Sequence, residues 1–312
     1  MTHPEPSAAA PLEPMEPDNS LGATVEELAP SEMAPGVPSA DAAADAGEAK
    51  AAATDTHLPD VATTADLATP TAAPQQRERT KGVADIVFLI DVSGSMAPVI
   101  DALRRNIEIF IDSLSGADAN NASPVKDWRG KVVGYRDAEH DPNWFHDNPF
   151  VRDAVALKAQ LASLSAEGGG DEPESILDAL YKVSTMATSP KGAQSVEPTQ
   201  WRYRSEAARV VVVFTDASAR ETMVIPEAKG GSLQDVANVM MANRIILSLF
   251  APNFEVYDRL SQIDKSEWEV VEFEGLNAQQ ALQKYTSDQA NFRNTLKQLA
   301  ASVSKSAETV AL

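Results

Sequence analysis

One short segment of the sequence concentrates oxygen ligands: Asp-Val-Ser-Gly-Ser at positions 91–95. Asp91 supplies a carboxylate, and Ser93 and Ser95 supply hydroxyls, a set that favours a hard cation such as Mg²⁺ or Mn²⁺. The chain has no cysteine, so a softer thiolate site for zinc is not expected. The same residues would also suit a plain turn, with Gly94 in the turn and a serine capping the next helix. Taken alone, the motif leaves both interpretations open.

Acidic residues recur at two other points of the chain. Asp216 follows the apolar run Arg209–Phe214, and the segment Glu-Gly-Gly-Gly-Asp-Glu-Pro-Glu at 167–174 precedes a helical pattern. Strands of a parallel sheet end at one common edge, and ligand sites lie just beyond that edge. Asp91, Asp216 and the acidic loop are therefore predicted to meet there, which favours the metal interpretation.

Apolar runs and helical patterns alternate after residue 80. Continuous apolar runs, typical of parallel strands covered on both faces, predict strands at 85–90, 209–214 and 244–250, with weaker candidates at 131–135 and 268–273. Amphipathic patterns predict helices at 99–114, 151–164, 174–186, 232–242, 254–263 and 277–304. This alternation predicts an α/β fold, with a doubly wound, mostly parallel sheet flanked by helices.

Residues 1–80 differ from the rest of the chain in composition. They contain none of the 18 aromatic residues, 11 of the 20 prolines, and 14 acidic against three basic residues. Such a segment cannot bury enough apolar surface to offset the entropy of ordering it, so we expect a disordered acidic tail. Further along, residues 188–204 carry turn residues and no clear period, which predicts a surface loop, and residues 306–312 form a short C-terminal tail.

The charge and the N-terminal sequence narrow the choice of partners. With 46 acidic against 26 basic residues, the net charge is −20, which disfavours nucleic acid and anionic membrane surfaces. A basic protein or a metal ion fits this charge better. The chain starts without a basic region or an apolar run, and no stretch approaches the roughly 20 apolar residues of a membrane span. We therefore expect a cytoplasmic protein.

Residues 81–305 resemble the von Willebrand A domains that carry a metal-ion-dependent adhesion site (MIDAS). In that family a D-x-S-x-S motif supplies one carboxylate and two serine oxygens to the ion, which matches Asp91, Ser93 and Ser95. An aspartate after a later core strand also belongs to the family's site, and it matches Asp216. The resemblance implies a Mg²⁺ or Mn²⁺ site with these four residues as ligands.

The sequence departs from many members of this family in the acidic loop. Those members place a threonine ligand there, whereas this chain has none between residues 167 and 174. The loop resembles instead the integrin β-subunit variant, in which an Asp-x-Pro-Glu segment gives a glutamate to the metal, here Glu174. The pair of Gly-Tyr-Arg-Asp and Gly-Gly-Gly-Asp-x-Pro-Glu segments is also similar to the A domains of alpha-kinases and of many bacterial proteins. The chain leaves no room for a kinase.

The integrin-like variant also implies a second ion. There a strand-end aspartate and the Asp-x-Pro-Glu loop bind a neighbouring Ca²⁺, and the corresponding residues here are Asp137 and Asp171. Asp137 has a simpler alternative, because it could form a salt bridge with Arg136 or cap a turn. We treat the two aspartates as a possible second metal site or as supports of the first.

The resemblance implies a binding function. In the family, an Asp or Glu of a protein partner completes the coordination of the ion, and the surrounding loops give specificity. Bacterial A-domain proteins often work beside MoxR-type AAA+ ATPases, which makes such an ATPase a candidate partner. In relatives that switch affinity, the final helix moves. The corresponding helix here begins at about Asn277.

A metal-assisted phosphoesterase-like hydrolase that uses the same acids is the alternative function. The nearest such enzymes, the haloacid-dehalogenase-like phosphotransferases, need a second acid two residues after the first, where this chain has Ser93. A serine hydrolase is disfavoured because Asp91 and Ser95 stand where a Gly-x-Ser-x-Gly elbow needs glycines. A non-catalytic module is therefore the preferred prediction.

Overall fold

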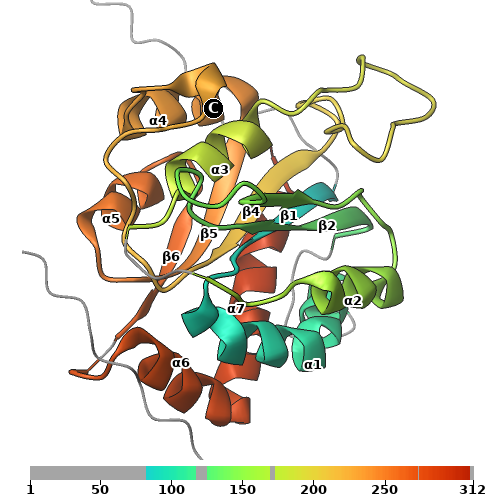
Figure 1. Cartoon of the computed structure of the whole chain (residues 1–312). Helices are drawn as coiled ribbons and strands as arrows, with labels where there is room; N and C mark the ends of the chain where they lie inside the picture. The colour runs from blue at the N-terminus through green and yellow to red at the C-terminus, as the bar shows by residue number, and fades with distance from the viewer. Residues whose placement is uncertain (1–81, 117–124, 169–172, 273, 310–312) are drawn as a thin grey trace, which may run out of the picture. The chain divides into compact units, whose positions relative to one another are not determined.

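The computed structural model describes residues 82–116, 125–168, 173–272 and 274–309. A six-stranded sheet in the order β3-β2-β1-β4-β5-β6 forms the centre of these residues (Figure 1). All neighbouring strands are parallel except β3, which pairs with β2 in the antiparallel direction. The strands are β1 (Val83–Asp91), β2 (Asp127–Tyr135), β3 (Phe145–Asp147), β4 (Ala208–Phe214), β5 (Ile245–Pro252) and β6 (Glu267–Val271).

The parallel register aligns the ends of the three central strands. Asp91, the last residue of β1, lies opposite Tyr135, the last residue of β2, and Ile90 lies opposite Phe214, the last residue of β4. Both faces of these strands are covered, which explains their unbroken apolar runs. Polar residues that follow β1 and β4 are therefore delivered to the same edge of the sheet.

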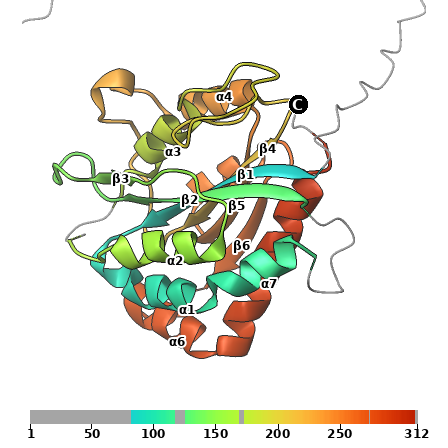
Figure 2. The same cartoon turned by 90° about the vertical axis from the view of Figure 1, so that its right-hand side faces the viewer.

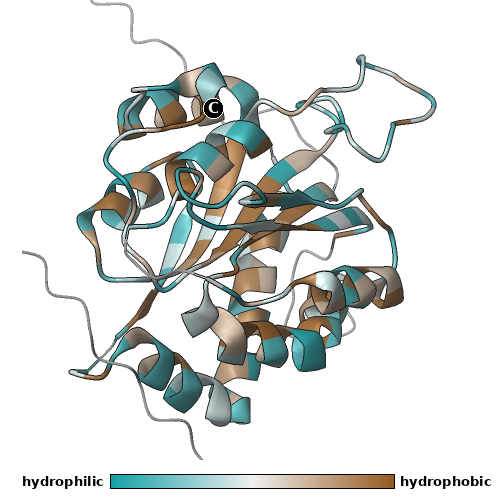
Figure 3. Cartoon of the chain, viewed as in Figure 1, coloured by the Kyte–Doolittle hydropathy of each residue, from teal (hydrophilic) through white to brown (hydrophobic). Residues whose placement is uncertain are grey.

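Helices cover both faces of the sheet (Figure 2). Helices α1, α2, α6 and α7 pack on one face, and α3, α4 and α5 pack on the other, each set around its own apolar cluster. The strands and the inward helix faces are the most apolar parts of the ribbon (Figure 3). The helices are α1 (Ala97–Leu114), α2 (Ala154–Ser163), α3 (Ile176–Ser184), α4 (Leu233–Asn243), α5 (Glu255–Ser261), α6 (Ala278–Ser287) and α7 (Gln289–Ser306), with short 3₁₀ turns at Gly94–Met96 and Pro226–Ala228.

The doubly wound α/β architecture predicted from the sequence is confirmed, but two details differ. Strand β3 is three residues long and has no apolar run, so hydropathy gave no signal for it. The helical pattern at 277–304 forms two helices, because the chain bends at Asp288, whose side chain accepts a hydrogen bond from the Asn291 N–H and caps α7. A bend with an N-cap interrupts the backbone without interrupting the apolar spacing.

Residues 188–204 contain no helix or regular strand, and most of their side chains are exposed. Trp201 is an exception, since it is fully buried and donates its indole N–H to the Val183 carbonyl at 2.9 Å. The expected tail at 1–80 lies outside the described residues. Within the described ranges, no helix combines the length and apolar character that a bilayer crossing requires.

Candidate metal site

Asp91 lies at the end of β1 with its side chain fully buried. One carboxylate oxygen accepts the backbone N–H of Ser93 at 2.8 Å, and the other accepts the hydroxyl of Thr215 at 2.9 Å. Thr215 directly follows β4, so this hydrogen bond links the ends of the two central strands. The carboxyl group is thereby held at the sheet edge that the sequence predicted.

Ser93 and Ser95 lie in the turn that leads from β1 into α1. Their hydroxyl oxygens are 3.2 Å apart. The turn is fixed to the next acidic segment, because the Gly94 N–H donates to the Gly168 carbonyl at 3.1 Å and the Glu167 N–H donates to the Val92 carbonyl at 3.0 Å. A β-carbon at position 94 would lie 3.3 Å from the Gly168 oxygen, so glycine allows this close approach.

Glu174 reaches the same edge from the segment before α3. Its backbone forms a bridge with Ala219, through hydrogen bonds with Ser218 at 3.0 Å and Arg220 at 3.1 Å. The side chain is 2% exposed, and its Oε2 atom accepts no hydrogen bond from the described residues. A buried carboxylate oxygen without a hydrogen bond destabilises the fold unless a bound ion, a water molecule or another residue contacts it.

Asp216 lies two residues beyond β4 and is 1% exposed. It is close enough to Asp91 for their charges to interact: burial raises the pKa of Asp91 to about 7, and the negative charge of Asp216 contributes to the rise. Burial also raises the pKa of Glu174 to about 8, with further contributions from Asp91, Asp137 and Asp216. The structure therefore brings Asp91, Glu174 and Asp216 together as a group of mutually repelling buried acids.

This group fits a divalent cation that is held partly by hydroxyls. A 2+ charge would offset the repulsion among the acids, and oxygen atoms are the ligands that Mg²⁺ and Mn²⁺ prefer. No three His, Asp or Glu side chains converge tightly enough to hold an ion by themselves anywhere in the part of the chain that the structure describes. An ion at this edge would thus need the serine hydroxyls, and water, in addition to the carboxylates.

Asp137 has a different environment from these three acids. It accepts hydrogen bonds from two nitrogens of the Arg220 guanidinium, Nε at 3.0 Å and Nη2, and contacts His140 Nδ1 at 2.6 Å. Burial acts to raise its pKa, but the hydrogen bonds from Arg220, His140 and the Glu139 N–H outweigh it and lower the pKa to about 2. Asp137 is thus neutralised by the protein itself.

The simpler alternatives for Asp137 can be compared with this arrangement. The expected salt bridge between Arg136 and Asp137 is wrong, because Arg136 pairs with Asp141 at 2.6 Å. The expected turn cap is present, since the Glu139 N–H donates to Asp137 at 2.9 Å. Asp171 lies outside the described residues, and a second ion between these aspartates stays a prediction.

The sequence patterns did not identify two residues that contact the acids of the site, Thr215 and Arg220. Thr215 holds Asp91, and its place directly before Asp216 at a strand end could have suggested a supporting role. Arg220 pairs with Asp137 and, at 2.7 Å, with Glu139. Its contacts depend on the path of the loop after β4, which no local sequence pattern encodes.

The fold agrees with the comparison to known families. The model of the von Willebrand factor type A domain matches residues 85–287, and the chain belongs to this family. Domains of this family usually mediate protein–protein interactions. A search of curated proteins gave no match.

Solved structures with a similar fold share little sequence with this chain. The VWA domain of SpRpn10 has a TM-score of 0.38 and 9% identity, over 64% of this chain and 93% of that one. Proximal thread matrix protein 1 from the mussel byssus has a TM-score of 0.42 and 14% identity, over 69% of this chain and 50% of that one.

Proposed function

We propose that this domain binds Mg²⁺ or Mn²⁺ at the edge formed by β1 and β4, and uses the ion to bind a carboxylate of a protein partner. The proposed ligands are Asp91, Ser93, Ser95, Glu174 and Asp216. The observation that carries the proposal is the burial of Asp91 and Glu174 beside one another, with no ion pair to a lysine or arginine of the described residues. Buried charges are otherwise paired or bound to metals.

The balance of charge supports a role for a partner's acidic residue. Three ionised carboxylates around a 2+ ion leave a net charge near −1, and Mg²⁺ usually keeps several coordination positions for water. Such a position can accept an Asp or Glu from a partner. The negative surroundings make a lone carboxylate a weak ligand, so affinity and specificity must come from further contacts around the ion.

Direct titration of the full chain with Mn²⁺ and Mg²⁺ tests the metal site. We expect one ion to bind to the native chain, and Asp91→Ala to lose it. Asp112→Ala is the matched control, because Asp112 is exposed and lies at the other end of α1, near Leu114. Equal binding by the Asp91→Ala and native chains would contradict the proposal.

A second experiment tests the use of the ion. Partners captured from a lysate with Mg²⁺ should be lost with EDTA and with Asp91→Ala, and retained with Asp112→Ala. An AAA+ ATPase of the MoxR type is one candidate among them, on the basis of the family resemblance alone.

The same preparations test for catalysis. A non-catalytic module should show no turnover of generic phosphate esters. Metal-dependent turnover that disappears in Asp91→Ala would favour the phosphoesterase-like alternative instead.

A further inference from the structure

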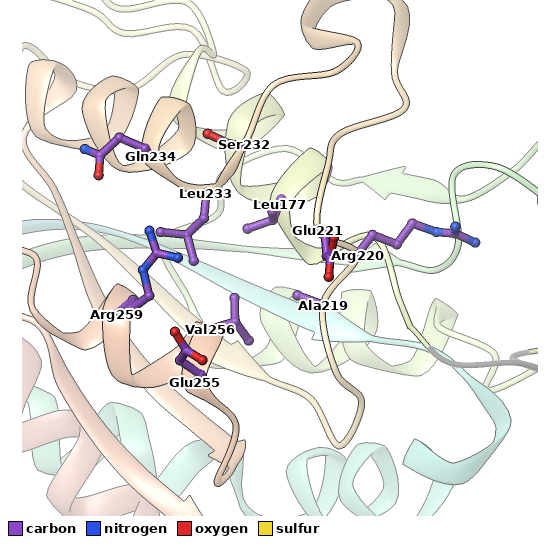
Figure 4. Close-up of a pocket in the computed structure, with 10 residues that line it drawn as sticks. All are labelled: Leu177, Ala219, Arg220, Glu221, Ser232, Leu233, Gln234, Glu255, Val256 and Arg259. Carbon is purple, nitrogen blue, oxygen red and sulfur yellow. The ribbon is translucent and has the colours of Figure 1, made fainter. Parts of the chain in front are cut away.

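A cavity of about 370 Å³ is lined by the residues drawn in Figure 4. It lies between α3, the loop after β4, α4 and α5, on the sheet face that these helices cover. Its volume is at the lower end of the range of about 300–1,000 Å³ that is typical of ligand pockets. The lining residues are Leu177, Ala219, Arg220, Glu221, Ser232, Leu233, Gln234, Glu255, Val256 and Arg259.

The cavity and the candidate metal site share two segments of the chain. Ala219 lines the cavity, follows Asp216 by three residues and forms the backbone bridge with Glu174. Leu177, which also lines the cavity, follows Glu174 by three residues. A partner held at the metal site would therefore have this cavity within reach.

The lining combines apolar surface with charged groups. Leu177 and Leu233 are buried, and Ala219 and Val256 are half-buried, which gives the cavity an apolar surface. Glu221, Glu255 and Arg259 are exposed and form no ion pair with any of the residues described in the structure. Apolar walls with exposed carboxylates suit a ligand that is itself part apolar and part cationic.

The two arginines of the lining offset the charge of these glutamates only in part. Figure 4 shows Arg220 directed away from the other lining side chains, and its guanidinium pairs with Asp137 and Glu139. Arg259 extends from α5 toward Leu233 at the start of α4. Two carboxylates and one guanidinium without partners leave the cavity with an excess of negative charge.

We propose that this cavity binds a lysine or arginine side chain of the partner. Its methylene groups would pack on Leu177, Leu233 and Val256, and its charged end would pair with Glu221 and Glu255. This inference rests on the proposed function, because it makes the cavity a second contact for a partner whose acidic residue binds the ion. The net charge of −20 on the whole chain favours such a basic neighbour.

The test uses the full chain with ¹³C-labelled leucine, valine and alanine methyl groups, in EDTA. The probe is Nα-acetyl-lysine N-methylamide, compared with its norleucine analogue, which lacks the ammonium group, and with Nα-acetyl-glutamate N-methylamide. We expect the lysine probe to shift the methyl resonances of Leu177, Leu233 and Val256 saturably. The norleucine probe should bind about fivefold more weakly, as the loss of an exposed ion pair of about 1 kcal/mol implies.

Variants separate the charges in the cavity. Glu221→Gln and Glu255→Gln should each weaken binding of the lysine probe severalfold, and Arg259→Gln should strengthen it. Glu197→Gln is the matched control, because Glu197 is exposed and does not line the cavity. It lies in the 188–204 segment, which contacts the start of β1 through the hydrogen bond between Arg202 and Asp85. This variant should leave binding unchanged.

Four results would overturn the inference. These are absence of saturable shifts with the lysine probe, equal binding of the norleucine probe, tighter binding of the glutamate probe, and weaker binding in Arg259→Gln. Asp91→Ala should still bind the lysine probe in EDTA. Failure of the metal proposal would therefore leave this result intact, and failure here would leave the metal titration intact.

Discussion

Strand β1 buries an aspartate near each of its ends, and the two have opposite environments. Near the start, Asp85 accepts hydrogen bonds of 2.7–2.8 Å from the guanidinium groups of Arg129 and Arg202. At the end, Asp91 has no basic partner among the described residues, and burial beside Asp216 raises its pKa to about 7. Both side chains are fully buried.

The difference separates an end of the sheet whose buried charges are paired from the end where we propose the metal site. Arg202 comes from the 188–204 segment and also pairs with Asp127 at 2.7 Å, so this network fastens the segment to β1 and β2. The acidic and basic side chains of this network pair with one another. At the other end, Asp91 and Glu174 form no ion pair with a lysine or arginine of the described residues, which is the property expected of a site that receives an ion from solution.

Asp85→Ala should have the largest effect on stability. It leaves the buried Arg129 and Arg202 without their carboxylate, and breaking a buried ion pair in this way costs about 3–5 kcal/mol. Urea unfolding of the full chain measures the loss, and Asp112→Ala, at an exposed position, should change the free energy by less than about 0.5 kcal/mol. A loss below about 1 kcal/mol in Asp85→Ala would mean that the arginines simply turn to solvent.

The dependence of stability on pH should be the next largest effect. The pKa values of Asp91 and Glu174 rise from 3.8 and 4.5 to about 7 and about 8 on folding, so the folded chain retains protons that the unfolded chain has released. The free energy of unfolding in EDTA should therefore fall as the pH rises from 5 to 8. Saturating Mg²⁺ should reduce this decline.

Thermal and urea unfolding at several pH values measure this dependence. The double variant Asp91→Asn, Glu174→Gln is the control, because its two side chains do not titrate and its profile should be flatter. If the stability of the native chain in EDTA did not change with pH, folding would not raise the pKa values of Asp91 and Glu174.

Asp91→Asn should have a smaller effect, of the opposite sign to that of Asp85→Ala. It removes one negative charge from the repelling group, so the free energy of unfolding at pH 8 in EDTA should rise by about 1–2 kcal/mol. Added Mg²⁺ should no longer stabilise the variant, as differential scanning calorimetry with and without the ion would show. If Asp91→Asn instead destabilised the protein in EDTA, Asp91 would have a structural role like that of Asp85.

The fold could be predicted from the sequence because its central strands are covered on both faces. Burial on both faces requires an unbroken apolar run, as at Arg209–Phe214, and such runs are visible without a structure. Strand β3 could not be predicted, because at the sheet edge its pairing with β2 depends on backbone hydrogen bonds and not on apolar side chains. The break at Asp288 was hidden because the apolar spacing continues through it.

The acids at the sheet edge could be predicted because strand ends and acidic residues can both be read along the chain. The partners of these acids could not. Arg202 reaches Asp85 across 117 positions and Arg220 reaches Asp137 across 83, so these contacts depend on how loops return to the sheet. The sequence therefore showed where acids gather, and only the structure showed which of them the protein neutralises.

Ser95→Ala should have the smallest effect on stability. Without metal the half-buried hydroxyl has one hydrogen-bond contact among the described residues, at 3.2 Å to Ser93, so its loss should cost less than about 1 kcal/mol in urea unfolding. If Ser95 is a ligand, however, Mg²⁺ affinity should fall about tenfold by calorimetric titration. Ser163→Ala, which removes a comparable local hydrogen bond at the end of α2, should leave the affinity unchanged. Equal Mg²⁺ affinities in the two variants would show that the Ser95 hydroxyl is not a ligand. Binding of the ion at the end of β1 would then depend on the carboxylates and not on this serine.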